Sequence, residues 1–316
     1  MKFKTDTNLT STISVLALSS LLAACGGGGS GSSTGTLNLG LTDASVDKAK
    51  AVVVEFTGVQ LQSAGGDRID HDFVDEATGD PAPRQIDLLA LTGGTTERLL
   101  DGVTLNAGRY NWIRLKVNAE PGVIDSYIDL LDDTRHSLYI PSGAETGLKL
   151  NRGFEVPEDG MASFTIDFDL RKSVHYPSGL DGDRILRPTL RLVDDNTAGA
   201  LIGTVASGII TADPDACSGM DYVGAVYVFD NGDAVDDVDG TGDPVSSAKV
   251  SNDGNYAYTV AFLPEGDYSI AFTCDADIDD PGKDADIDTD PPDGPVNFIG
   301  ETTVTITAGK TTTHNF

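Results

Sequence analysis

The feature that most constrains the fold is the regular alternation of short apolar or β-branched runs with clusters of glycine, aspartate, asparagine and proline. No long stretch keeps the apolar spacing of an amphipathic helix. Short strands separated by frequent turn signals are typical of antiparallel sandwiches and barrels. The segment 85–91 fits either a short helical turn or a strand. The predicted strands are 36–41, 51–61, 110–117, 126–131, 162–168, 201–205, 223–229, 256–262, 268–272, 302–307 and 311–316.

A polar stretch at residues 194–198 separates two series of these strands. Each series is long enough for a domain of ordinary size, and 39% hydrophobic residues suffice to fill two cores. The sequence therefore predicts an all-β protein with two antiparallel β-sandwich domains, at residues 36–197 and 198–316.

The first 25 residues resemble a bacterial lipoprotein signal. Lys2 and Lys4 form a positive start, residues 13–24 are apolar or small, and Leu22-Ala23-Ala24-Cys25 matches the lipobox. The apolar run is shorter than the roughly 20 residues of a membrane-spanning helix. We expect residues 1–24 to be a removed signal peptide and Cys25 to carry the lipid, palmitate included. An ordinary signal peptide with an incidental cysteine is the alternative.

The lipid would hold the protein at a membrane, because two or three acyl chains anchor far more firmly than one. Residues 25–35 would follow as a tether, since the residues after Cys25 are only glycine, serine and threonine. Gly26 is not the aspartate that retains lipoproteins at an inner membrane. We therefore expect a lipid-anchored protein of the outer membrane, on its periplasmic or its outer side.

The chain is strongly acidic, with 50 Asp and Glu against 21 Lys and Arg and a net charge of -29. A field of this sign repels phosphate backbones, so nucleic acid is excluded as a partner. From residue 199 onward only three lysines face 22 acidic residues. Cations or a basic partner would complement this negative charge. The alternative is an acidic surface that is only solvated and has no specific partner, which would have the same composition.

Apart from Cys25, the chain has two cysteines, Cys217 and Cys274. Two thiols allow one pairing, and a protein outside the cytosol meets oxidising conditions. We predict a disulfide between them.

One pattern, L-x-x-G-x-Y, occurs in both halves, at residues 105–110 and 263–268. Each copy stands before an apolar strand, and its glycine allows the positive φ of a tight turn. The tyrosines, Tyr110 and Tyr268, would then reach back to the backbone like a tyrosine corner.

Four segments resemble the bacterial lipoproteins grouped as domain of unknown function 4382, over about residues 35–197. They are GTLNLGLTDA at 35–44, AVVVEFTGV at 51–59, FDLRKS at 168–173 and LRPTLRLV at 186–193. The resemblance implies no established activity. Residues 201–205 and 263–268 resemble a transthyretin-like or carboxypeptidase-regulatory sandwich, which implies Greek-key, prealbumin-like domains; that pattern is widely shared.

The acidic stretches of the second half suggest calcium as a candidate cofactor. Alternating carboxylates can surround one hard cation, and millimolar extracellular calcium would fill even a weak site. Neither stretch is an EF-hand, and an acidic loop without an ion remains the alternative. The candidate ligands are Asp275, Asp277, Asp279, Asp236, Asp239 and Asp243.

Trp112, the one tryptophan, suggests a carbohydrate platform. Strict alternation along the strand places Tyr110, Trp112 and Arg114 on one face, with Ile113 and Leu115 toward the core. An outward ring beside cations could bind a sugar or a carboxylate. Packing of the two aromatics under a loop is the alternative.

No catalytic motif is present: the four histidines are scattered, and there is no nucleophile elbow or nucleotide-binding glycine pattern. We therefore predict no catalytic residues and no enzymatic activity. The sequence indicates a lipid-anchored envelope protein with a binding or structural role. Calcium bound at the acidic stretches could stabilise it. The alternative is a carbohydrate-binding module of an uptake or adhesion system, with an envelope protein or a glycan as partner.

Overall fold

The computed structural model describes residues 33–44, 49–141, 147–175, 184–212, 217, 222–238, 242–279 and 296–316. The predicted signal peptide, the lipidation site Cys25 and most of the predicted tether lie outside these residues, as does Asp239. No helix in the described part is long and apolar enough to cross a membrane.

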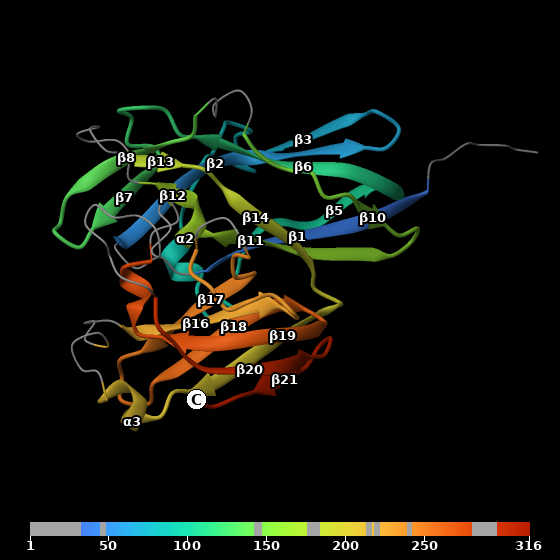
Figure 1. Cartoon of the computed structure of the whole chain (residues 1–316). Helices are drawn as coiled ribbons and strands as arrows, with labels where there is room; N and C mark the ends of the chain where they lie inside the picture. Colours follow the sequence, from blue (N-terminus) through green and yellow to red (C-terminus); the bar gives the residue numbers. More distant parts are fainter. Residues whose placement is uncertain are drawn as a thin grey trace, which may run out of the picture. The chain divides into compact units, whose positions relative to one another are not determined.

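Two sheets built from residues 34–194 face each other across one core. Leucines of β1 (Thr34–Ala44) and apolar side chains of β2 (Ala49–Ser63) belong to the same buried cluster. The smaller sheet has the strand order β14-β11-β1-β5. In the larger sheet, β2 lies beside β3 and β6 (Figure 1). The other strands of the smaller sheet are β5 (Glu97–Asn106), β11 (Met161–Asp169) and β14 (Thr189–Asp194).

The larger sheet has the order β10-β6-β2-β7-β8-β13-β12, with β3 and β4 also paired to β2 and β9 to β6. The strand β4 runs directly into the short 3-10 helix η1, so the ambiguous segment 85–91 is a strand followed by a helical turn. The bounds are β3 (Arg68–Asp72), β4 (Arg84–Asp87), η1 (Leu88–Leu91), β6 (Gly108–Asn118), β7 (Tyr127–Leu130), β8 (Arg135–Tyr139), β9 (Leu148–Leu150), β10 (Phe154–Val156), α2 (Leu170–Ser173), β12 (Val174–His175) and β13 (Arg184–Leu186).

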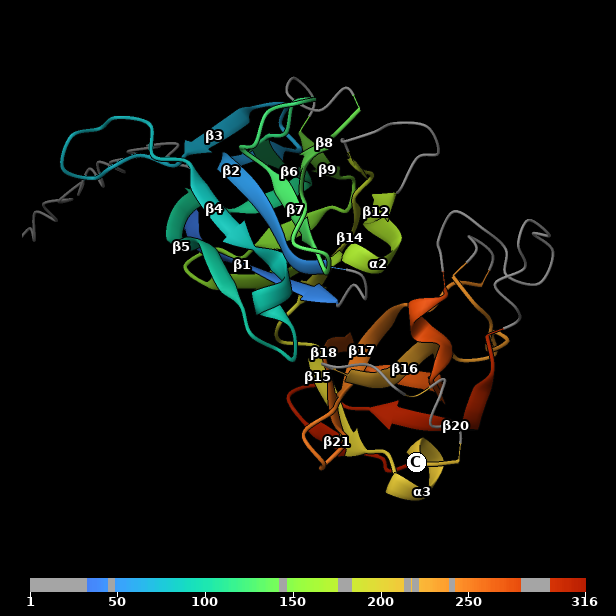
Figure 2. The same cartoon turned by 90° about the vertical axis from the view of Figure 1, so that its left-hand side faces the viewer.

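A second pair of sheets is built from residues 198–313, with the orders β18-β15-β21 (Figure 2) and β17-β16-β19-β20. Apolar side chains of both sheets form a second buried cluster. The bounds are β15 (Ala198–Thr204), α3 (Ser207–Ile210), β16 (Tyr222–Asp230), β17 (Ser246–Ser251), β18 (Ala257–Pro264), β19 (Gly266–Thr273), η2 (Asp275–Asp277), β20 (Phe298–Ile306) and β21 (Thr311–Thr313).

The all-β sandwich prediction is confirmed, but the sheets are mixed rather than purely antiparallel. β1 pairs in parallel with β11, β8 with β13, and β15 with β21. Parallel neighbours need a crossover connection, which local turn signals do not reveal. Residues 33–316 form one compact unit, so the domain boundary predicted after residue 197 stays a prediction.

The predicted tether ends earlier than expected, because β1 begins at Thr34. Gly35 pairs with Leu105, and a Cβ at this position would stand 2.2 Å from the Pro157 carbonyl oxygen. The glycine is therefore required by close packing of the backbone and is not a flexible spacer.

Both L-x-x-G-x-Y patterns form the predicted corner. The Tyr110 hydroxyl donates to the Asn106 carbonyl at 3.0 Å, and Tyr268 donates to the Pro264 carbonyl at 2.9 Å. Each bond spans four residues back along the chain. Gly108 has a φ of +124°, as expected for a tight turn, whereas Gly266 does not have a positive φ, so the second corner forms without one.

The strand β16 is buried along almost its whole length, because both faces of its sheet are covered. Val226 and Val228 face the second core, whereas Tyr227 and Phe229 belong to a third cluster on the opposite face. Burial on two faces explains why this strand is nearly all apolar. The predicted disulfide between Cys217 and Cys274 is confirmed; their Cα atoms are 4.8 Å apart.

Candidate functional site

The outer face of the larger sheet gathers an aromatic ring and three cations. We call Arg68, Trp112, Arg114 and Lys149 the Trp112 face. Cross-strand register creates it: Gln62 of β2 pairs with both Trp112 and Arg68, while Arg114 pairs with Lys149 of β9. Three strands, β3, β6 and β9, thus contribute one surface.

A β-bulge decides which side chains point outward. The pairing of β2 with β6 shifts between Gln62–Trp112 and Ser63–Tyr110, so Asn111 is extra. Tyr110 and Ile113 consequently both point into the core, and Tyr110 is only 1% exposed. The prediction that Tyr110 shares the platform is therefore wrong, because strict alternation does not hold across the bulge. Tyr110 instead stacks on Phe154 with ring centroids 5.1 Å apart.

The three cations surround the half-buried Trp112 ring. The Lys149 Nζ lies 4.9 Å from the ring centroid, and the guanidinium carbons of Arg114 and Arg68 lie 5.0 and 6.0 Å away. These distances are within the range of cation–π attraction. The ring therefore holds the positive charges together on the surface against their mutual repulsion.

Neither arginine of this face is neutralised by an acid. Arg114 Nη1 donates to the Gln60 side chain at 3.1 Å, and Arg68 Nε donates to Gln62 at 3.3 Å. In the described part of the chain, no carboxylate forms an ion pair with Arg68, Arg114 or Lys149. In a chain with 50 acidic residues, this cluster keeps its positive charge available to a ligand.

The next cation along β6 provides a contrast. Lys116 pairs with Asp72 and, at 3.4 Å, with Asp70. The hydrogen bond that Lys116 donates to Asp72 raises the pKa of Lys116. A cavity of about 150 Å³ adjoins both cations, and the Arg114 Nε, buried beside it, has no hydrogen-bond partner. The cavity is lined by Thr57, Gln60, Arg114, Lys116, Val117, Asn118 and Gly147.

This arrangement is suited to binding an anion next to a flat apolar ring. A guanidinium offers a planar pair of N–H donors to a carboxylate, and the ammonium of Lys149 adds a mobile point charge. Arg68 and Lys149 lie far from Trp112 in sequence and were not predicted for this site. Their placement depends on strand register, so no local signal could have indicated it.

The acidic residues proposed for calcium make other contacts. Asp279 is 6% exposed; its carboxylate accepts from the Tyr227 hydroxyl at 2.5 Å and from the Val238 N–H at 3.0 Å. Asp275 accepts from the backbone and side-chain nitrogens of Asn297, both at 2.9 Å. Asp279 is therefore a buried hydrogen-bond acceptor rather than an open ligand.

The other candidates are spread over separate positions. Asp277 is exposed, Asp236 accepts from the neighbouring Asp237 N–H, and Asp243 lies 3.5 Å from Lys172 Nζ. Within the described residues, no three His, Cys, Asp or Glu side chains come together as a metal site. Calcium binding stays a prediction.

Comparison with known protein families assigns the first half of the chain to a family. Residues 34–188 match the family described as domain of unknown function (DUF4382). This part of the chain belongs to that family. The DUF4382 segment contains the whole Trp112 face, and the second sheet pair follows it. No curated protein matches the chain.

Solved structures give weak likenesses. The minor pilin GBS52 of Streptococcus agalactiae is 10% identical, with a TM-score of 0.20 over 89% of this chain and 94% of that one. The major pilin BcpA of Bacillus cereus is 11% identical, with a TM-score of 0.21 over 90% and 98%. The Bacillus anthracis TIE protein is 11% identical, with a TM-score of 0.21 over 90% of this chain. The chain spans 34% of the length of the TIE protein. Scores this low support no statement about function.

Proposed function

We propose that this protein is a non-enzymatic binding protein of the cell envelope, anchored by lipid at Cys25, whose Trp112 face binds a carbohydrate that carries carboxylates. The observation that supports the ligand is the cluster of three cations without carboxylate partners around one tryptophan. An indole ring stacks on the apolar face of a sugar, and arginine binds its carboxylate.

The overall negative charge does not oppose this ligand at close range. At physiological ionic strength, charges more than about 8 Å apart are largely screened. Two acidic residues near the face, Asp70 and Asp72, are already paired with Lys116. Asp67 is exposed beside Arg68, so the ligand's carboxylate is expected to bind on the side of Arg114 and Lys149.

The proposal predicts selective binding of acidic glycans. A galacturonate oligomer should bind the wild type and change the fluorescence of Trp112, the single tryptophan, whereas a neutral glucan of equal length should bind far more weakly. Arg114→Gln should weaken binding at least about tenfold, because a hydrogen bond to a charged group contributes roughly 1.5–3 kcal/mol. Trp112→Ala should weaken it about as much, as titration calorimetry would show.

Arg135→Gln is the matched control. Arg135 also lies over an aromatic ring, 3.7 Å from the Tyr127 centroid, but Asp129 pairs with it. Its replacement should leave glycan affinity unchanged. Equal affinity for the acidic and neutral oligomers, or equal losses in the Arg114 and Arg135 variants, would contradict the proposed ligand.

The anchor predicts a separate result. Wild-type cells fed radiolabelled palmitate should yield labelled protein that sediments with outer membranes, because acylation would fix it there. Cys25→Ser should abolish the label and release the protein from membranes. A labelled serine variant, or unlabelled wild type in the cytosol, would refute the predicted location while leaving glycan binding open.

A further inference from the structure

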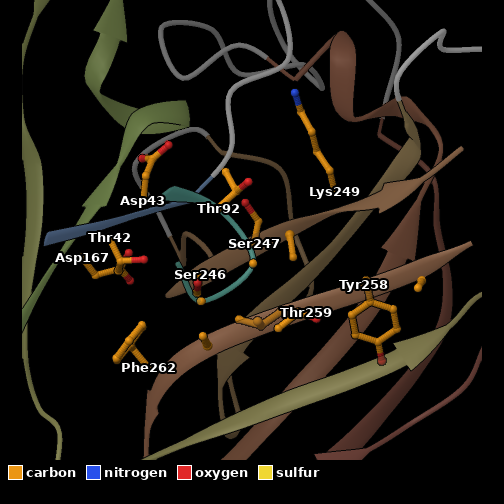
Figure 3. A pocket seen from close by; sticks show the side chains of 16 residues that line it. Thr42, Asp43, Thr92, Asp167, Ser246, Ser247, Lys249, Tyr258, Thr259 and Phe262 are labelled. Carbon is orange, nitrogen blue, oxygen red and sulfur yellow. The ribbon is translucent and has the colours of Figure 1, made fainter. Parts of the chain in front are cut away.

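A second site, independent of the Trp112 face, is a cavity of about 250 Å³ beside the end of β1. β1, β11 and the segment after η1 form one wall, and β17 and β18 form the other. In the view of Figure 3, Thr92 and Ser247 lie between Asp43 and Lys249. The polar residues that line the two walls include Thr42, Asp43, Asp167, Thr92, Ser247 and Lys249.

Asp43, at the end of β1, is a buried acid in the lining of this cavity. It is 7% exposed, and among the described residues neither of its carboxylate oxygens has a hydrogen-bond partner. Its acidic neighbours are both neutralised: Asp167 pairs with Arg191, and Asp169 lies 3.7 Å from Lys172 Nζ. Asp43 and Asp167 both line the cavity, and of these two carboxylates only Asp43 has no ion pair among the described residues.

This arrangement penalises the ionised form of Asp43. Burial, followed by the charges of Asp167 and Asp169, raises its pKa well above the usual value. The Leu170 N–H and the charge of Lys249 lower the pKa of Asp43, but by less than burial and the two neighbouring acids raise it. The Lys249 ammonium lies over the Tyr222 ring, 4.5 Å from its centroid. The ionised form of Asp43 is therefore disfavoured unless a further cation joins it.

We propose that the cavity binds a small organic ligand with a primary ammonium group, which donates hydrogen bonds to Asp43. The hydroxyls of Thr92, Ser246 and Ser247 are suited to contact a hydroxyl or other polar group on the same ligand. The volume lies below the roughly 300–1,000 Å³ of drug-sized sites, so the ligand is small. A divalent metal fits less well, because no three acidic, His or Cys side chains converge among the described residues.

Ethanolammonium chloride is a suitable probe, with glycerol, potassium chloride and calcium chloride as comparisons. Ethanolammonium at millimolar concentration should raise the Tm of the wild type and give a binding isotherm by calorimetry. Asp43→Asn should weaken binding at least tenfold, whereas Asp101→Asn, at an exposed carboxylate, should leave it unchanged. Calorimetry in buffers of different ionisation enthalpy should show proton release, because the ammonium favours the ionised carboxyl.

The dependence of stability on pH distinguishes a ligand site from a buried neutral acid. Because the folded-state pKa is raised, the stability that Asp43 contributes is present at low pH and is lost as pH rises from about the ordinary value of 3.8 through the raised one. Asp43→Asn should lack this loss, and ethanolammonium should reduce it in the wild type. The same loss with and without ethanolammonium, equal binding by the Asp43 variant, or a response to calcium or potassium alone would overturn the proposal.

Discussion

Replacing Arg171 by alanine is expected to lower the free energy of unfolding by about 3–5 kcal/mol, because two hydrogen bonds of a buried charged group are lost at roughly 1.5–3 kcal/mol each. Arg171, in α2, is 3% exposed. Its Nη1 donates to the Tyr227 hydroxyl at 2.6 Å and to the Ala276 carbonyl at 2.8 Å. Tyr227 in turn donates to Asp279 at 2.5 Å.

The loss follows from what the alanine leaves behind. Without the guanidinium, the buried Tyr227 hydroxyl and the Ala276 carbonyl each lose a hydrogen-bond donor. The guanidinium also lies over the Tyr227 ring, 5.1 Å from its centroid. Urea unfolding, followed by Trp112 fluorescence for the first sheet pair and by far-ultraviolet circular dichroism for the whole chain, measures the change.

Two variants calibrate this result. Arg98→Ala, at an exposed ion pair, should change stability by less than about 1 kcal/mol. Tyr227→Phe keeps the ring but removes the hydroxyl, and should cost an intermediate amount, about 1–3 kcal/mol. A loss from Arg171→Ala no larger than that from Arg98→Ala would show that the buried network does not stabilise the fold.

Removing the disulfide is expected to lower the free energy of unfolding by about 4 kcal/mol. Cys217 and Cys274 are 57 residues apart, and closing a loop of this length restricts the unfolded chain by that amount in the entropic account. The bridge ties the segment before β16 to the end of β19. The double variant Cys217→Ser, Cys274→Ser should therefore unfold at lower urea, with the change concentrated in the second sheet pair.

A chemical measurement accompanies this prediction. Thiol titration of the unreduced, denatured wild type should find no free thiol at positions 217 and 274, and reduction should expose two. Wild-type protein whose stability does not change on reduction would contradict the expected contribution. Two reactive thiols before reduction would show that the bridge does not form in solution.

The strands and turns follow from local signals, so the sequence alone predicted most of them. Alternating β-branched runs indicated β1, β2, β6, β11 and β16, and the two tyrosine corners followed from one repeated pattern. The disulfide was also predictable, because two cysteines allow a single pairing. Shorter strands such as β9 and β10 were missed, since three residues carry no detectable periodicity.

The candidate sites depend on contacts that the sequence does not encode locally. A bulge at Asn111 turned Tyr110 into the core, and register between four strands brought Arg68 and Lys149 to Trp112. In the sequence, Asp279 resembles the other acidic candidates for calcium. In the structure it is buried and accepts a hydrogen bond from the Tyr227 hydroxyl.

The sequence by itself determined the all-β class, the turns, the cysteine pairing and the membership of the first half in the DUF4382 family. Only the tertiary structure decided which ionisable groups lack an ion-pair partner in the described part of the chain: the cations around Trp112 and the carboxyl group of Asp43. The physical reason is the separation along the chain over which each interaction acts. Backbone preference acts between neighbours in the chain, whereas burial and ion pairing depend on which strands meet and in which register.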